Sequence, residues 1–184
     1  VDMRTLLPGY PAVMAEVSGD PVAAWDDLFG GPAQLREGRL GDNILYVLEA
    51  GHLFDRPGNI YLGPDGEDWP DNPLRFAALS RAAALVGADG VGGWHPQVLH
   101  CHDGKAGFAP TYLRHLGAEG RVGSLITIHN MAFQGLAPAS LMAQLMLPAA
   151  DFGPQRLEYY GQLSALKAAL IDATAISTVS PTYA

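Results

Sequence analysis

Two mostly hydrophobic runs in the second half of the chain each end in polar residues. The run Val98–Cys101 leads to Asp103, and the run Val122–Ile128 leads to His129 and Asn130. Short apolar runs rich in β-branched residues are typical of buried strands. Ligands of open α/β sheets collect outside the carboxyl ends of parallel strands. The two polar ends therefore predict one binding site.

The first half of the chain predicts strands and hairpins, followed by a long loop. Met3–Leu7 and Ile44–Leu48 are short apolar runs that predict strands. Between them, residues 20–43 contain several glycine-rich turn points, which favour antiparallel hairpins. Residues 51–71 are rich in Gly, Pro, Asp and Asn and have no sustained period, which indicates a long ordered loop. Loops of this length in compact domains are usually functional or disordered.

The second half alternates helices with strands. Asn72 and Pro73 are favoured at a helix N-cap and at its first position, and the apolar stripe that follows predicts a helix ending at Gly87. Further helices are predicted over 105–116, 139–147 and 163–171, and further strands over 98–101, 122–128 and 175–179. This alternation predicts an α/β fold with a parallel, doubly wound sheet and right-handed crossovers.

The composition indicates a soluble globular protein and limits its partners. The 184 residues are 48% hydrophobic and 16% charged, which suits one domain. A formal net charge of −8 argues against nucleic-acid and anionic-membrane partners, because both attract basic surfaces. The uncharged stretch 122–151 contains His129 and Gln134 and does not predict a membrane span. The single Cys101 excludes an internal disulfide and fits a reducing compartment.

The histidines of the first polar strand end allow more than one chemistry. His100 and His102 are two apart on a strand, so both rings point to one face and Cys101 points to the other. Together with Asp103 they could form the corner of a metal site, but Lys105 is no ligand for a divalent metal. We interpret His100 as a core imidazole bonded to the backbone. Asp103 is interpreted as the N-cap of the next helix, as an acceptor for a sugar hydroxyl, or as both.

His129 and Asn130 suit a polyhydroxylated ligand, because imidazole and amide groups offer donors and acceptors on a rigid strand end. The alternative is an interior histidine that pins the following loop. The usual phosphate-binding motifs and the nucleophile elbow of hydrolases have no match in the sequence. Asp55, Arg56 and Tyr61 are candidates for the rim of a cleft or belong to a solvated loop. Lys167 is interpreted as a solvated charge.

Five motifs occur in one order along the chain. They are LLPGYP at 6–11, LFDRPGN at 53–59, VLHCHD at 98–103, TIHNMAFQG at 127–135 and TVSPTYA at 178–184. Together they resemble the bacterial glycogen synthase and plant starch synthase family. The resemblance is highly specific, because it covers essentially the whole chain in family order.

The resemblance implies the N-terminal half of a GT-B glycosyltransferase, a Rossmann-like parallel sheet with flanking helices and a β-hairpin insertion. This family transfers glucose from ADP-glucose, with retention at the anomeric carbon, to the non-reducing end of an α-1,4-glucan acceptor, without a metal or other cofactor. His129 is implied to bind the donor glucose near its 6-hydroxyl and to stabilise an oxocarbenium-like transition state. Asp103 is implied beside the transferred sugar, with Asn130, Tyr61 and Gln134 as substrate-binding residues. The expected location is the bacterial cytoplasm.

The chain departs from the family pattern next to Asp103. Gly104 stands where the family usually has Trp, and Lys105 stands where His or Gln is usual. Losing the indole removes a platform for a glucan ring. The family's first strand with its Lys-x-Gly-Gly-Leu loop, and its second, nucleotide-binding domain, have no counterpart in residues 1–184. We therefore expect a partial N-terminal domain that does not catalyse transfer alone.

Two other function classes stay open at this point. One is a non-catalytic glucan-binding or pseudoenzyme module, which Gly104 makes plausible. The other is a metal-dependent hydrolase built on His100, His102 and Asp103. The sequence does not distinguish ADP-glucose from UDP-glucose as the donor, because the absent domain mainly holds the nucleoside.

Overall fold

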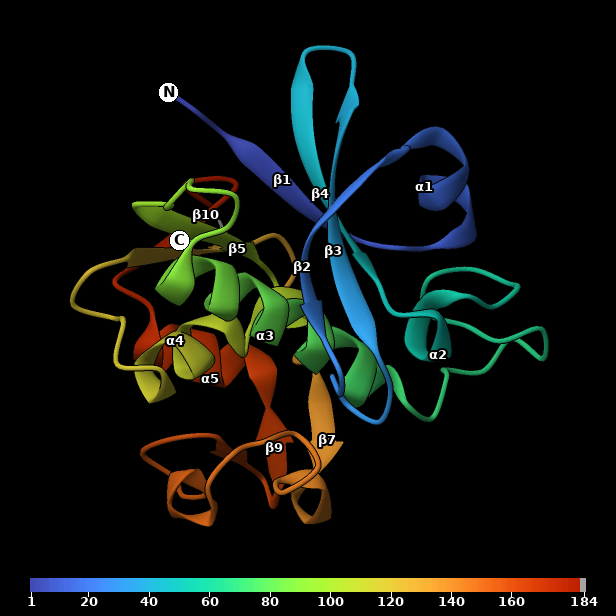
Figure 1. Cartoon of the computed structure of the whole chain (residues 1–184). Helices are drawn as coiled ribbons and strands as arrows, with labels where there is room; N and C mark the ends of the chain where they lie inside the picture. Colours follow the sequence, from blue (N-terminus) through green and yellow to red (C-terminus); the bar gives the residue numbers. More distant parts are fainter. Residues whose placement is uncertain (183–184) are drawn as a thin grey trace. The chain divides into compact units, whose positions relative to one another are not determined.

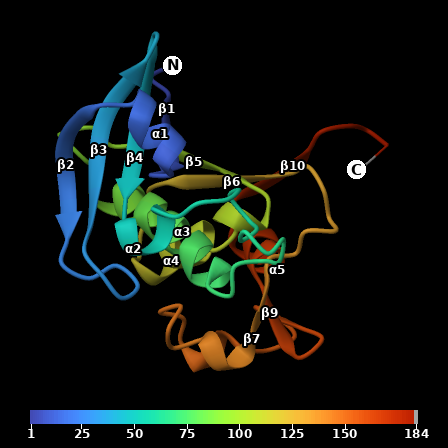
Figure 2. The same ribbon diagram turned by 90° about the vertical axis from the view of Figure 1, so that its right-hand side faces the viewer.

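The computed structural model describes residues 1–182, so Tyr183 and Ala184 of the last motif lie outside the described residues. The chain divides into two compact units, Val1–Leu79 and a second that begins at Ser80. It is an α/β protein with a mixed sheet in the first unit and a parallel and an antiparallel sheet in the second (Figures 1 and 2). Within residues 1–182, no helix is long and apolar enough to cross a membrane.

The first unit is built on a four-stranded sheet of order β1-β4-β3-β2. Its elements are β1 (Arg4–Pro8), α1 (Pro11–Glu16), β2 (Gly19–Trp25), β3 (Ala33–Leu40) and β4 (Asn43–Glu49). β1 and β4 are parallel, whereas β2, β3 and β4 form successive antiparallel hairpins. The strands expected at 3–7 and 44–48 and the hairpins expected within 20–43 are therefore confirmed.

Two arginines hold the long loop that follows α2 (Gly51–Phe54). The fully buried Arg75 donates hydrogen bonds to the carbonyl oxygens of Leu53 and Ile60, at 2.9 and 3.2 Å. Arg56 forms a two-point ion pair with Asp71, with both N–O distances at 2.8 Å. The loop expected over 51–71 is thus ordered, although its first four residues form α2 instead. Arg56 stabilises the loop from within.

α3 (Asn72–Asp89) continues two residues beyond the expected end at Gly87, which was wrong. A Cβ on Gly87 would lie 3.1 Å from methyl carbons of Leu99 and of Leu113. This glycine therefore permits close packing inside the helix. The chain leaves the helix at Gly90, whose φ of 72° lies in the left-handed region that glycine adopts readily.

The second unit contains a three-stranded parallel sheet of order β10-β6-β5. Its strands are β5 (Val98–His102), β6 (Gly123–Ile128) and β10 (Ala175–Thr178), as expected within a residue at each end. One face carries Cys101 and Ile126, which pack against Ala109 of α4 (Ala109–His115) and Ala169 of α5 (Ala165–Asp172). The helices cover this face and so hold the strand ends in place.

Two predicted helices are interrupted. The helix expected over 105–116 consists of η1 (Gly104–Ala106) and α4, which are separated by Gly107 and Phe108, and Pro110 in the first turn of α4 has no N–H to continue the helix from η1. A Cβ on Gly107 would lie only 2.3 Å from the carbonyl oxygen of Ala165. The helix expected over 139–147 is only η2 (Ala139–Leu141), followed by turns that end at Met146, whose φ of 53° is left-handed.

A small antiparallel sheet of order β7-β9-β8 was missed in the sequence. Its strands are β7 (Leu136–Pro138), β8 (Glu158–Tyr159) and β9 (Gln162–Ser164), and η3 (Ala149–Asp151) lies between β7 and β8. Strands of two or three residues are too short to display a periodic pattern. α5 lies between this sheet and the parallel sheet (Figures 1 and 2).

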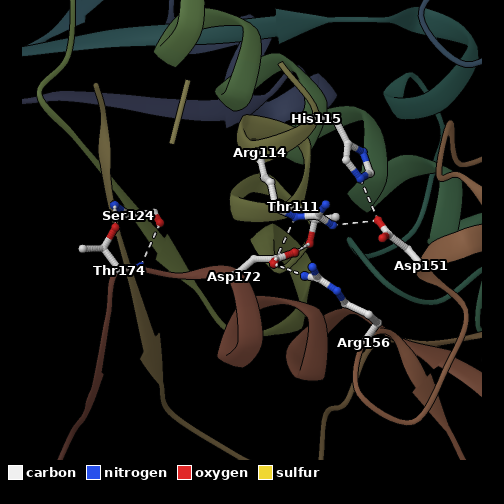
Figure 3. A network of polar contacts seen from close by, with 8 residues as sticks. All are labelled: Thr111, Arg114, His115, Ser124, Asp151, Arg156, Asp172 and Thr174. Atoms are coloured by element: carbon white, nitrogen blue, oxygen red, sulfur yellow. Dashed lines mark hydrogen bonds and ion pairs between the residues drawn. The ribbon is translucent and has the colours of Figure 1, made fainter. Parts of the chain in front are cut away.

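Charged side chains tie α4 and α5 to the segment that leads into β8 (Figure 3). Asp172 accepts hydrogen bonds from Arg114 and Arg156, at 3.2 and 2.9 Å. Asp151 accepts a hydrogen bond from Arg114 at 2.7 Å and lies 2.7 Å from Nε2 of His115. Burial by itself raises the pKa of Asp151, but the hydrogen bonds and charges of Arg114 and His115 outweigh burial and lower this pKa.

Candidate functional site

The carboxyl ends of β5 and β6 bring Asp103 and His129 together. His102 pairs with Thr127 in the parallel register, so the residues that follow them are neighbours. Oδ1 of Asp103 accepts the backbone N–H of His129 at 2.7 Å, and Oδ2 lies 3.1 Å from Nδ1 of the same residue. The prediction that the two polar strand ends meet is confirmed.

Asp103 adopts a backbone conformation that is rare outside glycine, with φ of 53° and ψ of −169°. Its side chain does not cap η1, so the N-cap interpretation was wrong. The carboxylate instead turns toward the loop after β6, where His129 provides two polar hydrogens. Such strain is retained only where the surroundings fix the conformation, and it is frequent at functional sites.

The contact with Asp103 fixes how His129 presents its ring. An ionised carboxylate only accepts hydrogen bonds, so Nδ1 carries the proton that faces it. In the neutral ring, Nε2 is then an acceptor. The side chain of His129 is 47% exposed, whereas that of Asp103 is 17% exposed. His129 is therefore no interior histidine, and an oriented imidazole nitrogen is accessible to a ligand hydroxyl.

His100 lies on the sheet face opposite Cys101 and is exposed, so its interpretation as a core imidazole was wrong. Residues of α4 and α5 pack against the Cys101 face. Nε2 of His100 lies 2.6 Å from Oγ1 of Thr127, and that oxygen lies 2.7 Å from Oγ of Ser177. A polar row thus crosses all three strands. Its two hydroxyls could not be predicted from the sequence, because their alignment depends on the register of the sheet.

The ring of His102 lies between those of His100 and His129. Its centroid is 4.3 Å from that of His100 and 5.4 Å from that of His129. Partial desolvation lowers the pKa of His102, the charges of the other two rings lower it further, and Asp103 opposes the shift. His102 therefore resists protonation. Among the residues that the structure describes, no group of three or more His, Cys, Asp or Glu side chains could hold a metal ion.

Asn130 and Gln134 bond within the loop that follows β6. Oδ1 of Asn130 accepts the N–H of Ala132 at 2.9 Å, and Nε2 of Gln134 donates to the carbonyl oxygen of Met131 at 2.6 Å. Oγ of Ser164 lies 3.2 Å from the backbone oxygen of Gln134. These bonds fix the shape of the loop beside His129, and direct substrate binding by the two amides stays a prediction.

Gly104 is buried against the same loop. A Cβ at this position would lie 3.1 Å from the backbone nitrogen of Gly135 and 3.2 Å from the carbonyl oxygen of Phe133. Any side chain here would push on backbone atoms, which yield little. Phe133 is itself 62% exposed, and the ammonium group of Lys105 lies 5.4 Å from its ring centroid. Backbone atoms of the loop thus lie in contact distance of the position that a Cβ atom at residue 104 would take.

Tyr61 belongs to the first unit and lies in the loop between α2 and α3. Its ring packs edge-on against Phe76 of α3, with centroids 6.1 Å apart. Its carbonyl oxygen accepts hydrogen bonds from Nδ2 of Asn72 and from the N–H of Trp69, at 2.9 and 3.0 Å. Tyr61 is therefore well ordered and half-buried, and its role at a cleft rim stays a prediction.

Comparisons with known proteins agree on one family. A family model described as "Starch synthase catalytic domain" matches residues 1–184. A glycogen synthase from Paracoccus denitrificans is 60% identical over the whole chain, which spans 39% of that relative. A glycogen synthase from Rhodopseudomonas palustris is 50% identical, and the chain spans 38% of it.

One solved structure supports the same assignment. It is the catalytic domain of starch synthase IV from Arabidopsis thaliana bound to ADP and acarbose, which matches with a TM-score of 0.71 and 26% identity. The match covers 97% of this chain and 38% of that one. The chain thus spans less than two fifths of the length of these relatives.

Proposed function

Because the chain belongs to the starch synthase catalytic domain family, we propose that it forms part of a retaining glucosyltransferase that moves glucose from ADP-glucose to the non-reducing end of an α-1,4-glucan. The glycogen synthases that match the whole chain support this activity. The relative solved with ADP and acarbose supports the ligand classes, a nucleoside diphosphate and a glucan-like oligosaccharide. The natural location in this proposal is the bacterial cytoplasm.

The contact between Asp103 and His129 carries the proposal. Asp103 sets the direction of the imidazole, whose Nε2 then accepts a hydroxyl of the donor glucose near its C6. As the sugar becomes oxocarbenium-like, positive charge develops at the anomeric carbon, and polar groups fixed in advance stabilise that state without reorganising. Asp103 also brings negative charge to the side of the transferred sugar. In this proposal both residues are catalytic.

The other predicted site residues have supporting roles. Asn130 and Gln134 contribute through the shape of the loop that carries them, because their side chains bond within it. Tyr61 is a further substrate-binding residue in this proposal. We place the chain in a Rossmann-like N-terminal half of a GT-B fold, with the nucleotide held mainly by a second domain.

A transfer assay tests the proposed function. The protein in its natural full length is incubated with labelled ADP-glucose and glycogen, and the labelled product is digested with an α-1,4-specific glucosidase. The proposal expects labelled, digestible glucan, and it expects none from residues 1–184 alone, because those residues span less than two fifths of the glycogen synthase they match. Transfer from UDP-glucose but not from ADP-glucose would contradict the donor assignment.

Gly104 favours one second candidate, a glucan-binding module without catalysis. The aromatic platform that the family usually places at this position would press on backbone atoms of the loop after β6. Glycogen binding by the full-length protein without any glucose transfer would support this candidate against the enzyme.

A further inference from the structure

Two tyrosines stand at the tip of the β8–β9 hairpin. Tyr159 is 36% exposed and Tyr160 is 87% exposed. Their rings meet edge to face, with centroids 4.8 Å apart and an interplanar angle of 85°. Aromatic side chains normally contribute by burial, so an exposed pair of this kind has no evident role in folding stability.

The backbone at this tip disfavours a tyrosine. Tyr159 pairs with Gln162, so Tyr160 and Gly161 form a two-residue turn, and their φ values are 49° and 80°. Positive φ at both positions is typical of a type I′ turn, which favours Asn followed by Gly. Bulky residues adopt this region rarely. Tyr160 therefore occupies a position where turn formation would select another residue.

The base of the hairpin is firmly held. Oε1 of Glu158 accepts the N–H of Gly161 at 2.7 Å. Lys167, which the sequence suggested was a solvated charge, instead donates to the carbonyl oxygens of Pro154 and Glu158 at 2.7 and 2.5 Å. That interpretation was wrong, because the lysine reaches from α5 to the hairpin. The tyrosines are thus presented on an ordered support.

Beside the rings is a shallow hollow of about 260 Å³, lined by Glu158, Tyr159, Tyr160 and Lys167. Its volume lies below the usual range for drug-sized ligands, which begins at roughly 300 Å³. A hollow of this size suits a single sugar ring of a longer chain. Its lining combines aromatic faces with hydroxyl, carboxylate and ammonium groups, which match the C–H faces and hydroxyls of a sugar.

We propose that the β8–β9 hairpin is a second binding site for an α-1,4-glucan chain, with Tyr160 as its main contact. The inference rests on the proposed function, which supplies a glucan acceptor with many repeated units. A second site on the same protein raises the effective concentration of such a polymer at the strand ends, and it does nothing for an acceptor too short to reach both sites.

The test uses Tyr160→Asn in the full-length protein, because Asn favours the turn conformation while the ring is lost. Phe152→Ala removes another partly exposed aromatic side chain of the same unit and serves as a control. Glycogen affinity, measured by co-sedimentation without any donor, is expected to fall roughly five- to tenfold in Tyr160→Asn. It is expected to stay unchanged in Phe152→Ala.

Unchanged glycogen affinity in Tyr160→Asn would overturn the proposal. A second readout is the KM for glycogen, which is expected to rise in Tyr160→Asn while the KM for maltotriose stays constant. An equal rise for both acceptors would also overturn it, because the hairpin would then belong to the primary site. Co-sedimentation needs no catalysis, so failure of the proposed enzyme activity is distinguishable from failure of this site.

Discussion

Asp103 accepts two hydrogen bonds from one partner, His129: the backbone N–H at 2.7 Å and the ring Nδ1–H at 3.1 Å. The carboxylate thereby fixes both the start of the loop after β6 and the orientation of the imidazole. The two residues are 26 positions apart in the sequence and meet because β5 and β6 are parallel neighbours.

Asp103→Asn tests whether orientation of His129 matters for catalysis. Asn keeps an oxygen for the backbone N–H but loses the charge that holds the ring, so the imidazole is no longer fixed. We expect kcat for glucose transfer to fall on the order of a hundredfold, with little change in melting temperature. A variant with the wild-type kcat would show that this contact is only structural.

Asp103→Gly and Asp103→Ala separate backbone strain from side-chain contacts. Both variants lose the hydrogen bonds to His129, but only glycine adopts φ of 53° with ψ of −169° without strain. Asp103→Gly should therefore be more stable than Asp103→Ala by about 1 kcal/mol in denaturant unfolding. Equal stability of the two variants would mean that the backbone is unstrained.

Gly104→Ala tests the close contact with the loop. The added methyl group would press on backbone atoms of Phe133 and Gly135, so we expect a loss of about 1 to 3 kcal/mol in the free energy of unfolding. Gly120→Ala is the matched control, because a Cβ there meets no atom within 4 Å. If both variants were equally stable, residue 104 would have room for a side chain.

Asp151→Asn tests the charged network of Figure 3. The side chain is 9% exposed, and its loss would leave Arg114 and His115 without this partner, so the free energy of unfolding should fall by about 3 kcal/mol at pH 7. Glu119→Gln is the control, because Glu119 is an exposed carboxylate shortly after α4. This variant should have nearly the wild-type free energy of unfolding.

The sign of the pH dependence follows from the lowered pKa of Asp151. The folded protein holds this carboxylate ionised more strongly than the unfolded chain does. Its contribution is present above the unfolded value of 3.8 and is lost as pH falls through the folded value below it. The stability difference between wild type and Asp151→Asn should therefore shrink below about pH 4. If the stability difference between wild type and Asp151→Asn stayed constant down to the pH of acid unfolding, the ionised carboxylate of Asp151 would not be its cause.

The site at the ends of β5 and β6 could be predicted from the hydrophobic pattern of the sequence. Each strand is an apolar run with a polar end, and parallel pairing brings the two ends together. The orientation of Asp103 could not be predicted, because the choice between capping η1 and binding His129 depends on a tertiary contact. The exposure of His100 depends likewise on which sheet face the helices cover.

Errors in the predicted elements occurred where backbone segments far apart in sequence approach each other. Gly87 has the sequence signature of a helix end, but its small size serves packing against Leu99 and Leu113. Gly107, inside a predicted helix, leaves space for the carbonyl group of Ala165. A glycine needed for space and a glycine needed for a turn look alike in a single sequence.

The most direct test of the proposed site is the rate of glucose transfer from ADP-glucose to glycogen by His129→Ala in the full-length protein, beside His95→Ala as an exposed histidine outside the site. We expect kcat to fall on the order of a hundredfold or more in His129→Ala and to stay at the wild-type value in His95→Ala. Transfer at the wild-type rate by His129→Ala would contradict the assignment of the strand ends as the place where glucose is bound and transferred.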